Sequence, residues 1–135
     1  MKQLMMLMLA VVISAAAIGQ GKNVNKANTA FTKGEYAEAL ALIEPATSDE
    51  KTKDKGRTWY IRGQIYDAIA GSDDETIRAI DPDAYKKAAE SYLKVIELEN
   101  EGSNYRGLAQ LNYDNLKADV LNAGVLAFQE DNFQA

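Results

Sequence analysis

Apolar residues recur along the chain at spacings of three and four, which is the period of one face of an α-helix. The first two sets are Ala27, Ala30 and Phe31, then Tyr36, Ala39, Leu40 and Ile43. Between them, Gly34 can adopt the left-handed conformation that ends a helix. Pro45 has no backbone donor, so the second helix should end or kink near Glu44. The pattern predicts a helical hairpin, preceded by a polar, frayed segment over residues 20–25.

The middle of the chain predicts a longer helix. Residues 47–50, Thr-Ser-Asp-Glu, fit a capping box, so we expect the helix to start there or shortly after. Its strongest part spans residues 58–69. One face of that part carries Trp59, Arg62, Gly63 and Tyr66. The acidic stretch over residues 72–81 is expected to add one short helical turn.

Two further helices are expected after that turn. Asp81 and Pro82 have the types favoured at an N-cap and at the first helical position, so a helix is predicted over residues 84–98. Its inward side would carry Tyr85, Ala88, Ala89, Tyr92, Val95 and Ile96. Residues 99–104 should break it, and a last helix is expected over residues 111–129. Its buried side would carry Leu116, Val120, Ala123, Ala127 and Phe128. No segment shows sustained alternation of period two, so the predicted fold class is all-α, built from antiparallel helical hairpins.

An internal repeat relates the two ends of the chain. When residues 27–36 are placed over residues 124–133, Ala-Phe matches Ala-Phe and Tyr36 meets Phe133. The middle of the chain adds Trp-x-x-Arg-Gly-x-x-Tyr over residues 59–66 and Ala88-x-x-x-Tyr92. These residues resemble the tetratricopeptide repeat (TPR) pattern W-x-x-L-G-x-x-Y … A-x-x-x-F.

The resemblance covers nearly all of residues 23–135, with departures. Arg62 stands in place of Leu, and Lys51 and Asn100 occupy the positions of the closing Pro. The resemblance implies an irregular TPR-like array of two and a half stacked repeats over residues 20–135. The chain would stop after the first helix and turn of the third repeat. The domain is therefore expected to be truncated at its C-terminal end and to expose an apolar face there.

The first 19 residues look like a secretory signal peptide. Lys2 precedes an uncharged apolar run over residues 4–18, which is short for a membrane span, and small residues follow. Cleavage could follow Ala17 or Gly19, and an uncleaved anchor is the alternative. The expected location is the periplasm or cell envelope, as in exported TPR proteins of Gram-negative envelopes, with secretion as the alternative. No transmembrane segment is expected in the mature chain.

Composition limits the chemistry that is available. The chain has a net charge of −5, which argues against nucleic acid as a partner. It contains no His and no Cys, which removes Ser–His and Cys–His nucleophiles and most zinc sites. A phosphate-loop match around Lys22 fails at two positions, and the acidic residues over 73–83 fail the spacing of a calcium loop. We therefore expect no catalytic residue, no metal site and no cofactor.

The resemblance places a candidate peptide-binding groove on the first helices of the hairpins. In the middle hairpin Tyr60, Gln64 and Asp67 lie off the face that should be buried, and Asn28 is equivalent to Gln64. The alternative is that these four residues are ordinary solvated surface. A clamp for a C-terminal carboxylate is not expected, because the positions that would supply it include Val24, Leu121 and Val125.

The expected function is a non-catalytic protein–protein interaction or scaffolding module that binds a peptide or protein segment. Two alternatives remain open. The chain could be the regulatory or targeting N-terminus of a larger envelope enzyme whose catalytic part lies beyond residue 135. It could also be a structural spacer of the envelope. Fold alone does not decide among them, because one repeat architecture serves many roles.

Overall fold

The computed structural model describes the backbone of residues 21–133 and the side chains of residues 21–124. Within that range the chain is helical and contains no strand, which confirms the all-α prediction. A helical segment covers residues 21–32. The elements that follow are α2 (Tyr36–Ile43), a 3₁₀ turn η1 (Glu44–Thr47), α3 (Gly56–Ala70), α4 (Glu75–Arg78), α5 (Ala84–Leu98) and α6 (Asn104–Phe133).

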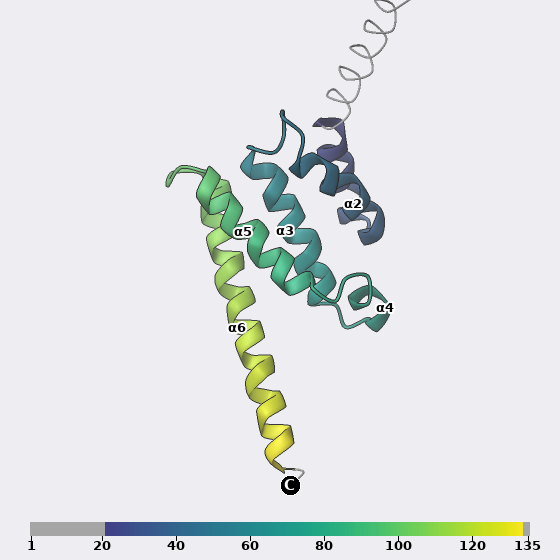
Figure 1. The fold of residues 1–135 in the computed structure, drawn as a ribbon, viewed down its shortest axis with the longest axis vertical. Helices are drawn as coiled ribbons and strands as arrows, with labels where there is room; N and C mark the ends of the chain where they lie inside the picture. Colours follow the sequence, from purple (N-terminus) through teal and green to yellow (C-terminus); the bar gives the residue numbers. More distant parts are fainter. Residues whose placement is uncertain (1–20, 134–135) are drawn as a thin grey trace, which may run out of the picture.

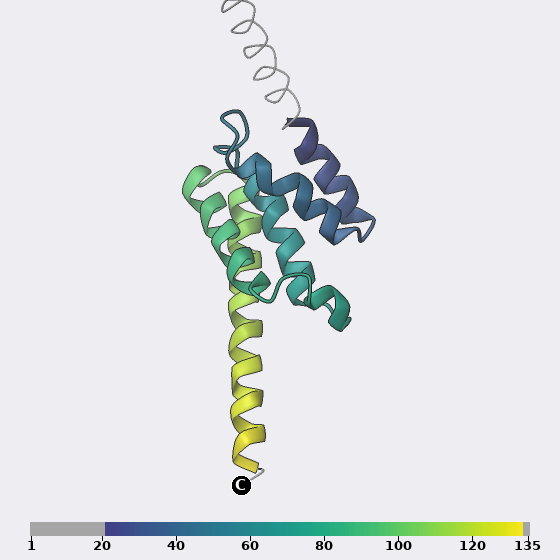
Figure 2. The same cartoon turned by 45° about the vertical axis from the view of Figure 1, so that its right-hand side comes forward.

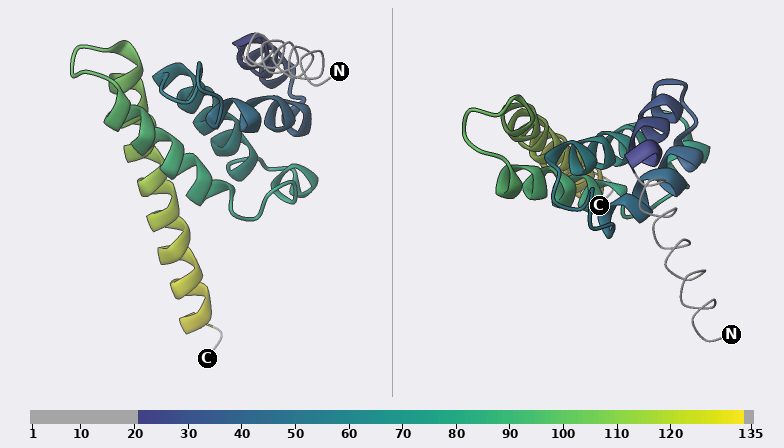
Figure 3. Two further views of the ribbon diagram at one scale, coloured as in Figure 1. Left: turned by 45° about the horizontal axis from the view of Figure 1, so that its top comes forward. Right: turned by 90° about the horizontal axis from the view of Figure 1, so that it is seen from above.

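Successive long helices run in alternate directions and pack side by side (Figures 1 and 2). The segment 21–32 and α2 form one hairpin, α3 and α5 form a second, and α6 follows α5 as a third layer. The short helix α4 lies in the connection between α3 and α5. The C-terminal half of α6 extends beyond the other helices (Figures 1 and 3).

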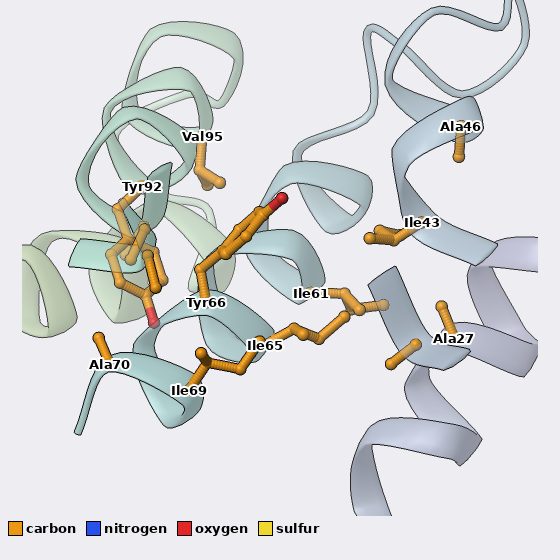
Figure 4. Packing of buried hydrophobic residues seen from close by; sticks show 14 of the residues in the cluster. Ala27, Ile43, Ala46, Ile61, Ile65, Tyr66, Ile69, Ala70, Tyr92 and Val95 are labelled. Atoms are coloured by element: carbon orange, nitrogen blue, oxygen red, sulfur yellow. The ribbon is translucent and has the colours of Figure 1, made fainter. Parts of the chain in front are cut away.

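The core lies on both sides of α3. Figure 4 shows Ile61 and Ile65 pointing from α3 toward Ile43 of α2, while Tyr92 of α5 lies on the other side. All four side chains are buried. Burying one large apolar side chain stabilises a fold by about 1.5–3 kcal/mol, so contacts of this kind hold the two hairpins together.

Gly63 permits a close approach of α3 to α5. A Cβ atom at this position would lie 2.6 Å from Cε1 of Tyr92. The Tyr92 side chain has no exposed surface, so it has little room to move away. A small residue on one helix and an aromatic ring on the next thus set the separation of the second hairpin.

Two predicted helix ends are confirmed. Gly34 has a φ of 78°, and the backbone amides of Gly34 and Glu35 donate to the carbonyls of Phe31 and Ala30 at 2.9 Å each. These two hydrogen bonds are the pair that defines a Schellman motif, and a glycine in the left-handed region completes it. The helix α2 ends at Ile43, immediately before Glu44, and Pro45 lies in the 3₁₀ turn.

Arg62, which departs from the repeat pattern, joins three elements through its guanidinium group. Its Nε lies 2.8 Å from Oε1 of Glu44, and its Nη1 donates to Oγ of Ser91 at 2.7 Å. Its guanidinium carbon lies 4.9 Å from the centre of the Tyr66 ring, and the Tyr66 hydroxyl donates to the same Glu44 oxygen. The guanidinium group of Arg62 thus links η1, α3 and α5.

The capping box predicted at residues 47–50 is wrong. Thr47 instead donates to the Glu44 carbonyl at 2.7 Å, and Asp49 accepts from the Lys51 amide at 3.0 Å. These polar side chains stabilise turns rather than a helix start, as Thr and Asp often do. The helix α3 begins later, at Gly56, whose amide donates to the Glu99 carboxylate at 3.1 Å.

The predicted frayed segment before Lys26 is also wrong where the structure describes it. Residues 21–25 are helical, and Val24 is buried because its apolar side chain extends the inward face by one turn. Gln20 lies outside the described residues. The short helix predicted within residues 72–81 is confirmed as α4, whose first turn is capped by Asp74 accepting from the Thr76 amide at 2.8 Å.

The start of α5 differs slightly from the prediction, although its bounds agree. Asp83 rather than Asp81 is the N-cap, and Pro82 precedes the helix. The Asp81 carboxylate accepts from the Asp83 amide at 2.9 Å and also pairs with Lys87. Five of the six residues predicted to face inward are buried or partly buried. Tyr85 is the exception, at 39% exposed, because it lies at the rim where α5 diverges from α6.

The last helix differs most from the prediction. The helix α6 starts at Asn104 rather than Leu111 and continues to Phe133, so the turn expected near residue 131 is wrong. The glycine that ends the first helix aligns with Asp131, which lacks the conformational freedom of Gly34. Leu116 is buried as expected, but Val120 and Ala123 are exposed because no described element covers them. The side chains of Ala127 and Phe128 lie outside the described residues.

Candidate functional site

A hollow of about 370 Å³ opens where four elements meet. The segment 21–32, α3, α5 and α6 each contribute at least one lining residue, with the C-cap of α3 completing the wall. The lining residues are Phe31, Gln64, Asp67, Ala68, Gly71, Tyr92 and Asn112. The hollow thus joins the segment 21–32, α3 and α6, whose lining residues Phe31, Gln64 and Asn112 lie far apart in sequence.

Helical geometry accounts for the largest wall of the hollow. Gln64, Asp67, Ala68 and Gly71 are spaced at i, i+3, i+4 and i+7, so they share one face of α3 and its cap. The next face of the same helix carries the buried Ile61, Ile65 and Ile69. The amphipathic pattern that buries the isoleucines therefore presents the polar pair to the hollow.

A chain of hydrogen bonds crosses the floor of the hollow. The Tyr92 hydroxyl donates to Oδ2 of Asp67 at 2.9 Å, and Nδ2 of Asn112 donates to the Tyr92 oxygen at 3.4 Å. Burial and the nearby Asp67 carboxylate raise the pKa of Tyr92 well above its usual range, so the hydroxyl stays protonated and remains a donor. These two hydrogen bonds link Asp67 to α5 directly and to α6 through Tyr92.

The Asp67 carboxylate carries a charge that no nearby cation balances. Burial raises the pKa of Asp67 above its ordinary value; the hydrogen bond from Tyr92 opposes this shift, and the negative charge of Asp119 adds to it. No Lys or Arg lines the hollow. Oδ1 of Asp67 and the side-chain amide of Gln64 make no hydrogen bond with the described residues. These groups are available to a ligand.

The four residues predicted for the groove divide into two pairs. Gln64 and Asp67 line the hollow together, whereas Asn28 does not line it. Tyr60 packs inward instead, with its ring centre 5.5 Å from that of Tyr105 and 6.2 Å from that of Tyr92. It therefore helps to join α3 to α5 and α6 and is not a free groove residue.

The other five lining residues were not predicted for the groove from the sequence. Phe31 and Tyr92 were assigned to the core because their spacing fits the buried face. That assignment is correct for Tyr92, whose side chain has no exposed surface although it forms part of the hollow wall. Asn112 reaches the hollow from α6, seven residues before Asp119 on the same helix face. No local signal marks an asparagine in a helix as part of a site.

A second, apolar groove of about 550 Å³ lies between α5 and α6. It is lined by Tyr85, Lys86, Ala89, Tyr113, Leu116, Lys117, Val120 and Leu121. Val120 is 49% exposed and Leu121 is 69% exposed. The apolar face that the sequence predicted at the C-terminal end was placed at Phe128, whose side chain lies outside the described residues. The charged side chains that line this groove are the cations Lys86 and Lys117.

The described residues contain no cluster of three or more acidic, histidine or cysteine side chains that could hold a metal ion. In the same part of the chain no helix combines the length and apolar character needed to cross a membrane. Comparisons of the chain with protein-family models, with curated proteins and with solved structures return no match.

Proposed function

We propose that the protein is a non-catalytic interaction module that binds an extended peptide or protein segment in the hollow beside Gln64 and Asp67. The observation that carries the proposal is that one hollow joins the first helix of all three layers. A ligand lying there would contact helices far apart in sequence. Such a cross-layer surface is how stacked helical hairpins bind extended partners.

The chemistry of the hollow fits a peptide. Its wall combines an aromatic ring, Phe31, with a side-chain amide and a carboxylate that have unused hydrogen-bonding capacity. Peptide segments offer backbone amides and carbonyls at regular intervals, and Gln64 can serve as a donor and as an acceptor for them. The TPR-like signature over residues 59–66 supports the same role by resemblance.

The location that we propose is the cell envelope. The apolar stretch over residues 4–18 after Lys2 supports export by its resemblance to a signal peptide. The partner would then be another exported protein or an exposed segment of an envelope protein. A scaffold of this kind needs no catalytic residue of its own.

The proposal is tested by selecting short random-sequence peptides on the immobilised full chain. Gln64→Trp should fill the hollow and lower the affinity of the selected peptides by about tenfold or more, which corresponds to about 1.4 kcal/mol. Gln110→Trp is the matched control, because Gln110 is exposed on α6 and lines neither concave surface. Selected peptides that bind both variants as tightly as the wild type would contradict the proposal.

A further inference from the structure

The charge of the hollow indicates which peptides it would select. Seven residues line it, and the only ionisable side chains among them are Asp67 and the phenol of Tyr92. Because the Tyr92 phenol keeps its proton and donates a hydrogen bond to Asp67, the hollow presents one carboxylate and no cation. Asp119, on the neighbouring helix α6, adds a second negative charge close enough to act on Asp67.

The carboxylate is positioned rather than free to turn away. Tyr92 holds Oδ2 at 2.9 Å, and Asn112 holds the Tyr92 oxygen in turn. Tyr92 is itself locked by the close contact with Gly63. Oδ1 accepts no hydrogen bond from the described residues and is not sealed from solvent, so it is left as the acceptor for a ligand. A fixed acceptor needs little further ordering when a ligand binds, which favours affinity.

We propose that the hollow selects segments that carry a Lys or Arg side chain, which pairs with Oδ1 of Asp67. The pairing rests on the proposed peptide-binding function and names the ligand class of the same site. A half-buried carboxylate gains a charge-assisted hydrogen bond from a cation, and such bonds are roughly twice as strong as neutral ones. The aromatic ring of Phe31, which lines the same hollow, offers an apolar surface for the methylene stem of the cation.

The other groups around Asp67 agree with this selection. Asp119 repels an anionic ligand, and Gln64 adds an acceptor for a second N–H of a guanidinium or ammonium group. An acidic peptide would instead bring a third negative charge to the site. The net charge of the whole chain, −5, also steers cationic segments toward it at low salt.

A double-mutant cycle tests the inference. The probes are a peptide selected on the immobilised full chain and its copies in which one Lys or Arg is replaced by Gln. On the wild type the replacement should weaken binding by about tenfold, the order expected for a hydrogen bond between charged groups. On Asp67→Asn the cationic and Gln peptides should bind equally, because asparagine keeps an acceptor for Tyr92 but removes the charge.

The control is Asp73→Asn, which makes the same change in net charge on an exposed connection outside the hollow. It should leave the preference for the cationic peptide unchanged. Selected peptides could lose binding on Gln64→Trp, contain no Lys or Arg, and bind Asp67→Asn as tightly as the wild type. That result would overturn the cation inference and leave the proposed function standing. A selection that yields no peptide sensitive to Gln64→Trp would overturn both.

Discussion

At the scale of single residues, polar side chains of α3 join it to neighbouring elements. Arg62 binds Glu44 of η1 and Ser91 of α5. Asp67 of α3 accepts a hydrogen bond from Tyr92 of α5, which fixes its carboxylate. The Glu44 carboxylate has the Arg62 cation beside it, whereas the Asp67 carboxylate has no cation beside it. Asp67 is therefore the residue whose ionisation should oppose folding.

The sign of the Asp67 effect follows from its raised pKa. The folded state holds the proton more tightly than the unfolded state, so the contribution of this group is fully present below the unfolded pKa and is lost as the pH rises through the folded pKa. Asp67→Asn should therefore unfold with a free energy at least equal to that of the wild type at pH 7, and the difference should shrink toward zero as the pH is lowered through the folded pKa.

Urea unfolding of both proteins over a series of pH values measures this difference directly. Asp73→Asn serves as the control, since it changes the net charge equally on an exposed residue. If Asp67→Asn were the less stable protein at pH 7, the carboxylate would be contributing to stability and the description of its surroundings would be incorrect.

At the scale of helices, the ends that depend on nearby residues could be predicted, and the ends that depend on distant ones could not. Gly34 and Pro45 act within their own turn, so the end of segment 21–32 and of α2 followed from the sequence. The start of α3 at Gly56 is capped by Glu99, which is 43 residues away. No local sequence pattern indicates a contact over this distance. The helix start was therefore predicted, wrongly, from the apparent capping box at residues 47–50.

The same distinction explains how the candidate site was predicted in part. Gln64 and Asp67 were found because helical spacing separates them from the buried face of α3. Tyr60 lies on the same side by spacing, yet it packs against Tyr105 of α6. Asn112 contributes from that same helix. The position at which α6 crosses α3 depends on the connections between the helices. The apolar periodicity within a helix carries no information about these connections.

The close approach of α3 and α5 makes a testable contrast between two helical glycines. Gly63→Ala should lower the free energy of unfolding by about 1–3 kcal/mol, because the new methyl group would collide with the buried ring of Tyr92. Gly107→Ala should instead raise it by up to about 1 kcal/mol, since its Cβ would meet no atom within 4 Å and alanine favours the helix.

Chemical denaturation of the two variants and the wild type gives both values. Gly107→Ala controls for the gain in helix propensity that accompanies any such substitution. A Gly63→Ala protein as stable as Gly107→Ala would show that α3 and α5 are not in the close contact described, and the wall of the hollow at Tyr92 would then be placed wrongly.

At the scale of the whole molecule, helices stack in layers and the last layer is only half covered. Leu116 of α6 is buried against α5, whereas Leu121, five residues further along, is 69% exposed. Among the residues whose side chains are described, the packed core therefore ends near the middle of α6.

Two leucine substitutions on α6 test where the packed body ends. Leu116→Ala should lower the free energy of unfolding by about 2–4 kcal/mol, because it leaves a cavity among buried side chains. Leu121→Ala makes the same chemical change on the exposed side and should alter it by no more than about 0.5 kcal/mol. Equal losses from both variants would mean that the C-terminal half of α6 is covered in solution.

The central claim is that the hollow shared by the three layers is the binding surface. The most direct test is to titrate the isotope-labelled full chain with a selected cationic peptide and to follow the backbone amide signals by NMR. The account predicts that the shifted signals cluster at Phe31, Gln64 and Asn112, on three helices distant in sequence. Shifts that cluster instead around Leu116 and Val120, in the apolar groove, would contradict it.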